Sequence, residues 1–282
     1  MKLRLISAEL FLAVASFIVA GGAAISLTTL AELMVFGFCG LAGSATINSY
    51  LDRDVDALMS RTVRRPIPSG RIEPAAAGAL GISLLAISVI FTAVLINWVT
   101  SAIIGIGSAL YIFFYTIYLK RRTPNAVLWG GISGAIPALG GWSAYTQSDW
   151  LIPIMIFLVV FLWQPSHFWS LSIYYRDDYR TAGIPALSTR KENSVIAFRG
   201  ALFNIAAIGV VYALYFIGHL SVVFLVIMTG MNIFLLTASV LATQDRPREF
   251  YRRNFRFSLL YMIMFLFALV VSGLLSPAVH LL

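Results

Sequence analysis

The sequence predicts an all-α membrane protein in which nine transmembrane helices form one polytopic bundle. Hydrophobic residues make up 60% of the 282 residues, and charged residues only 11%. Apolar runs of about 20 residues, the length that crosses the hydrocarbon core of a bilayer as a helix, recur from end to end. All 20 Lys and Arg residues fall in the N-terminus and in four polar loops. Such clustering is expected if those loops share one side of a membrane.

The apolar runs give the predicted spans in chain order. Each is expected to be helical, because backbone polar groups inside a bilayer have no water partners. The spans cover residues 5–25, 30–50, 75–96, 100–119, 124–145, 150–172, 195–217, 220–243 and 257–276. Short hairpins near 26–30, 97–100 and 218–221 join successive spans. Because no separate soluble segment is evident, residues 1–282 are expected to form one domain.

The basic residues predict the orientation of the bundle, since cytoplasmic loops carry an excess of Lys and Arg. They precede span 1 and lie around the loops that follow spans 2, 4, 6 and 8. An even number of spans would scatter these charges over both sides. The economical topology has the N-terminus inside and the C-terminus outside, in the cell (plasma) membrane. The net charge of +8 therefore reports orientation, and no nucleic-acid partner is expected. A basic face would also attract anionic lipid headgroups or a phosphorylated substrate.

Polar side chains with helical spacing occur where predicted span 2 leaves the membrane. Asn48, Asp52 and Asp56 stand at positions i, i+4 and i+8, which share one helix face over about 12 Å of axis. Two carboxylates one turn apart repel unless a cation lies beside them. Mg²⁺ suits this stripe, because it binds through one or two carboxylates together with substrate phosphates. The alternative is a solvated helix end whose acids pair with neighbouring arginines.

A second polar cluster ends predicted span 6 on the same side of the membrane. It consists of Tyr174, Tyr175, Arg176, Asp177, Asp178, Tyr179 and Arg180. Two carboxylate clusters facing each other across the mouth of a bundle, each interleaved with arginines, would hold a metal diphosphate from both ends.

These motifs resemble those of the UbiA-type intramembrane prenyltransferases. Three stretches carry the likeness: 48–66 (NSYLDRDVDALMSRTVRRP), 118–142 (YLKRRTPNAVLWGGISGAIPALGGW) and 161–185 (FLWQPSHFWSLSIYYRDDYRTAGIP). The runs at 165–169 and 178–185 are similar to the protohaem IX farnesyltransferase branch of that family. Tyr175 and Tyr179 stand where quinone-pathway relatives have a regular Asp-x-x-x-Asp.

The resemblance implies transfer of a farnesyl group from farnesyl diphosphate to the 2-vinyl group of protohaem IX (haem B), which gives haem O. It implies Mg²⁺ as the cofactor. The implied catalytic residues are Asn48, Asp52, Asp56, Asp177 and Asp178, all but Asp177 as metal ligands. The implied substrate-binding residues are Arg53, Arg61, Arg65, Lys120, Arg121, Arg122, His167, Tyr174, Arg176 and Tyr179. The expected partners are farnesyl diphosphate, haem B, membrane lipid, and a haem A synthase or terminal oxidase assembly.

Two residues and three other functions remain open at this stage. His167 is compatible with a contact to haem and with helix packing. Glu9, near the inner end of span 1, is compatible with a substrate contact and with a hydrogen bond to a neighbouring helix. A UbiA-type enzyme with a quinone-precursor or lipid acceptor is the closest rival. A secondary transporter would place ionisable groups near the bilayer midplane, and a scaffold has no reason to gather Asn, Asp and Arg at two helix ends.

Overall fold

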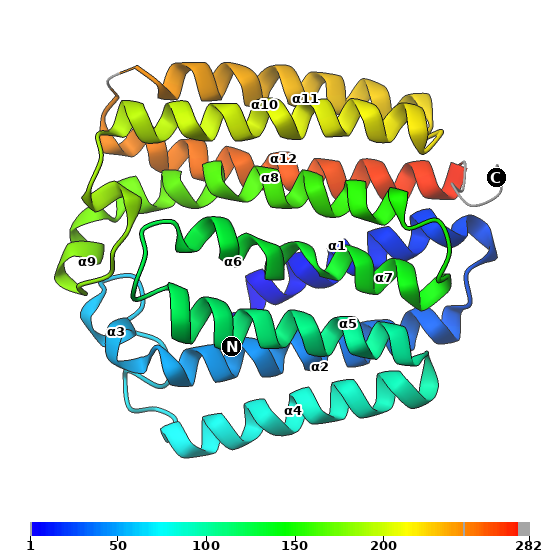
Figure 1. The fold of residues 1–282 in the computed structure, drawn as a ribbon, viewed down its shortest axis with the longest axis horizontal. Helices are drawn as coiled ribbons and strands as arrows, with labels where there is room; N and C mark the ends of the chain where they lie inside the picture. The colour runs from blue at the N-terminus through cyan, green and yellow to red at the C-terminus, as the bar shows by residue number, and fades with distance from the viewer. Residues whose placement is uncertain (1, 245, 276–282) are drawn as a thin grey trace.

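The protein is an all-helical bundle in a computed structural model that describes residues 2–244 and 246–275. Its long helices run side by side between two ends of the molecule (Figure 1). Eight helical segments in the described part are long and apolar enough to cross a membrane. They are α1 (Leu3–Gly21), extended by the short η1 (Gly22–Ala24), α2 (Leu27–Leu51), α4 (Pro74–Leu95), α5 (Trp98–Ala109) continued by the π-helix η2 (Leu110–Leu119), α8 (Leu151–Tyr174), α10 (Asn193–Ile217), α11 (Val222–Ala242) and α12 (Arg248–Leu275).

The expected fifth span is broken into two short helices, α6 (Ala126–Ala135) and α7 (Pro137–Tyr145). Pro137 has no backbone N–H and occupies the first turn of α7, where that group is not needed. Neither piece is long enough to span alone. The expected count of nine spans therefore stays a prediction.

The expected ninth span, 257–276, begins earlier in the structure. α12 starts at Arg248, so the basic residues 252, 253 and 256 lie on its first turns instead of in a loop. Residue 276 lies outside the described residues. The helix can extend past the apolar run because Arg and Glu, which occur in this stretch, have good helix propensity.

Close approach of helices holds the centre of the bundle together. α1 packs against α2, α7 and α12, and a side chain at Gly141 would place its Cβ 1.9 Å from the carbonyl oxygen of Ala13. Only glycine permits that crossing of α1 and α7. The largest buried cluster includes Trp142, Phe224 and Phe265, which join α7, α11 and α12.

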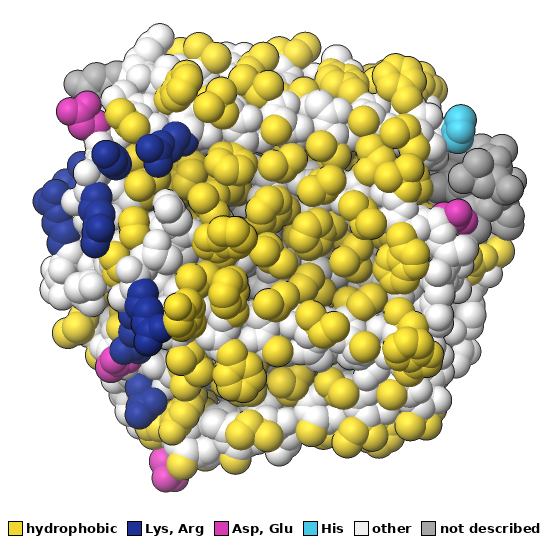
Figure 2. Space-filling model, viewed as in Figure 1, with side chains coloured by type: hydrophobic (Ala, Val, Ile, Leu, Met, Phe, Trp, Pro, Cys, Tyr) yellow, Lys and Arg dark blue, Asp and Glu magenta, His cyan; other side chains and the backbone are white. Residues whose placement is uncertain are grey.

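The polar segments gather at one end of the bundle. Figure 1 shows α3 (Arg53–Leu58) and α9 (Arg176–Thr181) at that same end. Figure 2 shows Lys and Arg side chains along this edge and a broad hydrophobic band beside it. Side chains such as Val94 and Phe216, 75% and 68% exposed, belong to the large hydrophobic surface. The protein is thus a multi-pass membrane protein with one charged end.

Candidate active site

Asn48, Asp52 and Asp56 form a continuous buried stripe at the junction of α2 and α3. The backbone N–H of Asp52 donates to the carbonyl of Asn48 at 2.9 Å, and that of Asp56 to Asp52 at 2.8 Å. The helical path therefore continues across the junction, and the predicted i, i+4, i+8 spacing holds. The three residues are only 1%, 1% and 3% exposed. Such burial argues against a merely solvated helix end.

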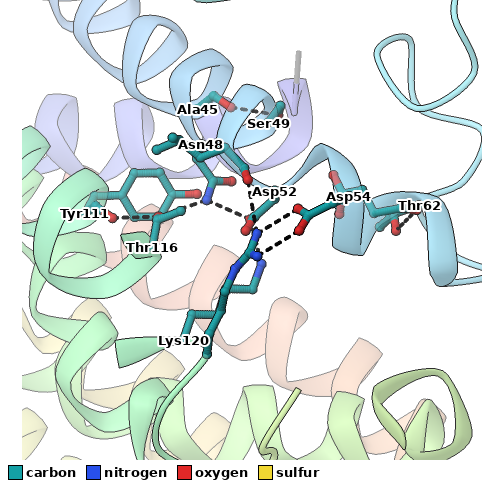
Figure 3. A network of polar contacts seen from close by, with 12 residues as sticks. Ala45, Asn48, Ser49, Asp52, Asp54, Thr62, Tyr111, Thr116 and Lys120 are labelled. Carbon is teal, nitrogen blue, oxygen red and sulfur yellow. Dashed lines mark hydrogen bonds and ion pairs between the residues drawn. The ribbon is translucent and has the colours of Figure 1, made fainter. Parts of the chain in front are cut away.

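Cations from three segments hold this stripe in the protein alone. Lys120 Nζ lies 2.5 Å from Asp52 Oδ2, and Arg65 Nη1 lies 2.6 Å from Asp56 Oδ2. The amide of Asn48 donates to Asp52 Oδ2 at 2.9 Å (Figure 3), and Lys2 donates to Asn48 Oδ1. Burial among these cations lowers the pKa of Lys2 to about 7. Three basic side chains thus surround the two carboxylates, and such side chains are able to attract an anion.

The π-helix η2 and the residue after it place two side chains, Thr116 and Lys120, against the stripe. Its backbone turn is wider than an α-helix, so Lys120 N–H donates to Tyr115 and Thr116 Oγ1 donates to Tyr111, each five residues back. Thr116 Oγ1 also accepts from the Asn48 amide at 2.9 Å. Thr116 and Lys120 thereby both reach the Asn48 to Asp56 stripe from a facing helix.

Other predicted phosphate-binding residues are turned away from the stripe. Arg121 holds Asp54 through two hydrogen bonds of 2.7 Å, which lowers the pKa of Asp54 to about 2. Arg53 folds onto the ring of Tyr50 at 4.5 Å, and Arg122 onto Tyr118 at 4.4 Å. Of the predicted basic clamp, Lys120 and Arg65 contact the stripe.

The second cluster touches the loop that follows the first. Asp178 accepts a hydrogen bond from Ser60 Oγ at 2.7 Å, and one from the backbone N–H of Arg61 at 3.4 Å. Tyr179 packs with Val55 in a small apolar cluster, and burial raises the pKa of its phenol. The two polar clusters are therefore neighbours at one end of the bundle, as predicted.

Several residues of the second cluster face elsewhere. Asp177 is exposed and pairs with Arg248 of α12, whose hydrogen bond lowers the pKa of the Asp177 carboxyl. Arg176 donates to Asn193, and Tyr174 lies under Arg252 at 5.2 Å. No hydrogen bond or ion pair joins Asp178 to Asp52 or Asp56 among the described residues.

His167 lies in the interface between α8 and α12. Its ring stacks between Trp163 and Phe255, with centroids 4.4 and 4.3 Å away, and its Nδ1 is 2.6 Å from Ser258 Oγ. It is 5% exposed. These contacts are those of a packing histidine, and a contact with haem stays a prediction.

The residues present fit a cation that arrives with a phosphate. Within the described ranges, no three His, Cys, Asp or Glu side chains form a ready metal centre. Asp52 Oδ1, however, is buried without any hydrogen-bond partner. A free carboxylate oxygen beside an amide and a second carboxylate meets the needs of Mg²⁺, which takes few protein ligands when it also binds phosphates.

An apolar cavity opens directly beneath this stripe. Its volume is about 740 Å³, including the open mouth. Ala45 and Tyr111 line it, and Ala45 lies one helical turn before Asn48. The lining comes from α1, α2, α5, η2, α6 and α7 and is mostly aliphatic, with Leu33 and Ile103 among its residues. This mostly aliphatic lining suits an apolar ligand chain.

The sequence profile of the UbiA prenyltransferase family matches residues 10–267, which is most of the chain. The protein belongs to the UbiA prenyltransferase family. A relative from Parafrankia sp. (strain EAN1pec), named protoheme IX farnesyltransferase, is 35% identical over 280 residues; these cover 98% of this chain and 89% of the relative.

Solved structures of UbiA homologues have the same fold. The apo structure of a UbiA homologue from Aeropyrum pernix K1 superposes with a TM-score of 0.76 at 19% identity, covering 96% of this chain and 98% of that one. A UbiA homologue from Archaeoglobus fulgidus bound to DMAPP and Mg²⁺ gives a TM-score of 0.65 at 16% identity, covering 95% and 97%. At such identities the likeness concerns the fold alone.

Two residues that contact the candidate site were not predicted from the sequence. Lys2 stands out there only as part of the basic N-terminus, yet it reaches Asn48. Thr116 is the one non-aromatic hydroxyl in the apolar run LYIFFYTIYL, and that contrast was an available signal.

Proposed function

We propose that this UbiA prenyltransferase transfers the farnesyl group of farnesyl diphosphate to the 2-vinyl group of protohaem IX, which gives haem O. The main support is the near full-length similarity, at 35% identity, to the protoheme IX farnesyltransferase of Parafrankia. The buried stripe and the cavity beneath it agree with a substrate that has a charged head and an apolar tail.

The chain's own residues account for much of the proposed diphosphate chemistry. Lys120 and Arg65 are drawn to carboxylates in the protein alone, and would turn toward phosphate oxygens when the substrate is bound. Positive groups in a site with little water stabilise the charge that develops on a leaving diphosphate. Mg²⁺ held by Asn48, Asp52 and Asp56 would add further positive charge there. The farnesyl chain would occupy the cavity under Ala45 and Tyr111.

The second cluster has a secondary part in the proposal. Asp178 borders the loop at Ser60 and Arg61, so it is the candidate for a further metal ligand from α9. The predicted catalytic role of Asp177 is retained only as a minor one. The predicted roles of Arg53, Arg61, Arg121, Arg122, Tyr174, Arg176, Tyr179 and His167 are also retained as proposals. Most of these side chains would have to leave their present partners to reach the substrate.

We also propose the orientation and the surroundings of the enzyme. The charged end would face the cytoplasm, because Lys and Arg favour that side. Counting α6 and α7 as one broken span gives nine crossings with the N-terminus inside and the C-terminus outside, and the whole chain as one domain. A haem A synthase or a terminal oxidase assembly would receive the product.

A direct assay tests the proposed function. The purified protein is incubated with haem B, farnesyl diphosphate and Mg²⁺, and the porphyrin products are identified by mass spectrometry. Farnesylated haem that forms only when all three are present is the expected result. Parallel reactions contain a quinone precursor in place of haem. Prenylation of that acceptor, with haem left unchanged, would replace this function by the quinone-pathway alternative.

A further inference from the structure

Glu9 on α1 is an acidic side chain that the proposed diphosphate site does not use. It is half-buried and lines the apolar cavity under the Asn48 to Asp56 stripe. Across residues 2–244 and 246–275 its carboxyl group makes no hydrogen bond and no ion pair. The packing alternative, a hydrogen bond to a neighbouring helix, is therefore not realised in the structure. A carboxyl group within a membrane span is costly, so one that makes neither a hydrogen bond nor an ion pair points to a function.

The rest of the cavity lining makes Glu9 stand out further. Ser44 and Ser108 satisfy each other at 2.9 Å, and Ser133 donates to the carbonyl of Gly130. The phenol hydroxyl of Tyr111, in contrast, makes no hydrogen bond within the described part of the chain. Glu9 and Tyr111 thus offer free polar atoms to a cavity whose other walls are mostly aliphatic.

The position of the cavity fixes where this carboxyl group acts. Figure 3 shows Tyr111 beside Asn48 and Thr116, and Ala45 about one turn before Asn48 in α2. Both Tyr111 and Ala45 line the cavity together with Glu9. If the diphosphate binds at the stripe, the first carbon of the farnesyl chain lies at the top of this cavity. The vinyl group of the acceptor must meet that carbon there.

We propose that Glu9 is the general base that takes a proton from a water molecule as this water adds to the former vinyl group and gives the hydroxyl group of the product. This role rests on the proposed function. The bond between the first farnesyl carbon and the diphosphate oxygen breaks, and its electron pair leaves with the diphosphate. The two π electrons of the vinyl group form the new carbon–carbon bond from its outer carbon. The inner vinyl carbon, now electron-deficient, gains the oxygen of water. One water proton passes to the Glu9 carboxylate and the other stays on the new hydroxyl group.

The proposed step predicts a change in the kind of product, which loss of packing would not cause. When Glu9 cannot take a proton from water, the carbon next to the electron-deficient one instead gives a proton to the released diphosphate. The product is then an alkene, lighter by one water. In Glu9→Gln, addition of water is expected to slow by about 10²-fold, the lower range of general-base effects. The alkene then replaces the hydroxylated haem as the main product. Glu9→Asp keeps a carboxylate and is expected to restore the hydroxylated product in part.

The experiment compares wild type, Glu9→Gln, Glu9→Asp and Glu32→Gln with haem B, farnesyl diphosphate and Mg²⁺, and measures the ratio of the two products by mass spectrometry. Glu32 is the matched control, because it lies in α2 and does not line the cavity; its variant should keep the wild-type ratio. A wild-type ratio in Glu9→Gln would overturn the role of Glu9. So would complete loss of transfer with unchanged farnesyl diphosphate affinity, because Glu9 would then act before water adds.

Two readouts keep the inference separate from the proposed function. If wild type makes no farnesylated haem, the proposed function fails, whatever the variants do. If Glu9→Gln does not fold, the product ratio of Glu9→Asp decides. A longer reach to water should raise its alkene share above that of wild type, and an unchanged ratio in a folded Glu9→Asp would overturn the inference.

Discussion

The two polar clusters at the charged end contain the same kinds of residue but differ in burial. Asp52 and Asp56, at the junction of α2 and α3, are almost wholly inaccessible, and each contacts a cation: Lys120 of a distant helix for Asp52, and Arg65 of the following loop for Asp56. Asp177, on α9, has a side chain that is 64% exposed, and its main partner is a surface arginine. Asp178 lies between these extremes, half-buried against Ser60.

The difference shows that spacing alone does not define an anion site. Charges interact more strongly where water is excluded, so a buried carboxylate with a free oxygen can hold a metal that an exposed one cannot. Exposed ion pairs of long side chains contribute little. The α2 end is therefore expected to control catalysis, and α9 to modulate it.

Replacement of Asp52 should have the largest effect. Asp52→Asn keeps the side-chain shape but removes the charge and weakens the free oxygen as a ligand. We expect kcat/KM for farnesyl transfer to fall by about 10²–10³-fold, as for loss of one preorganised electrostatic group. Binding of farnesyl diphosphate, measured by calorimetry with and without Mg²⁺, should lose its dependence on the metal. An unchanged metal dependence would contradict the assignment.

Asp178 should give an intermediate effect, and its neighbour Ser60 separates two explanations. Ser60→Ala removes only the hydrogen bond to Asp178, which is worth about 1 kcal/mol and predicts a loss of up to about tenfold in kcat/KM. Asp178→Ala removes that bond, the longer one from the backbone N–H of Arg61, and any metal contact. A further loss of about tenfold beyond Ser60→Ala would support a metal ligand, whereas equal losses would limit Asp178 to positioning the loop.

The sequence predicted the parts of this site that follow from local helical geometry. The stripe of Asn48, Asp52 and Asp56 needed only the 3.6-residue period, and the clustering of basic residues needed only one shared membrane side. The residues from other segments that contact this stripe could not be predicted from local spacing. Lys2 lies 46 residues from Asn48 in the sequence. Thr116 contacts Asn48 from a π-helix, which the spacing of residues in the sequence did not predict.

Burial also determined which partners the basic residues contact, and the sequence alone did not predict these. Arg121 and Lys120 are adjacent in the chain, yet Lys120 turns to the buried Asp52 and Arg121 to the exposed Asp54. The motif at 165–169 did not predict the surroundings of His167. Packing of α8 on α12 places its ring between those of Trp163 and Phe255.

Asp177 should have only a small effect on catalysis. Its pair with Arg248 is exposed on both sides, and such pairs contribute about 0–1 kcal/mol. Asp177→Asn is expected to keep kcat/KM within about threefold of wild type, with Arg248→Gln as the matched variant. Steady-state kinetics in the same membrane preparation provide the measurement. A loss as large as that of Asp52→Asn would remove the distinction between the two clusters.

Asp54 should have the smallest effect, and one that depends on pH. Arg121 holds its pKa at about 2, below the value of about 3.9 in an unfolded chain. The pairing therefore stabilises the fold fully above about pH 4, and this contribution disappears as the pH falls through 2. The Asp54 side chain is 59% exposed, so solvent screening limits the contribution to less than about 1 kcal/mol. Asp54→Asn should lower Tm slightly at pH 7, by less in high salt, and the difference from wild type should shrink as the pH falls below 4. A Tm difference that grew on acidification would mean that Asp54 is destabilising when charged, which is incompatible with its two hydrogen bonds to Arg121.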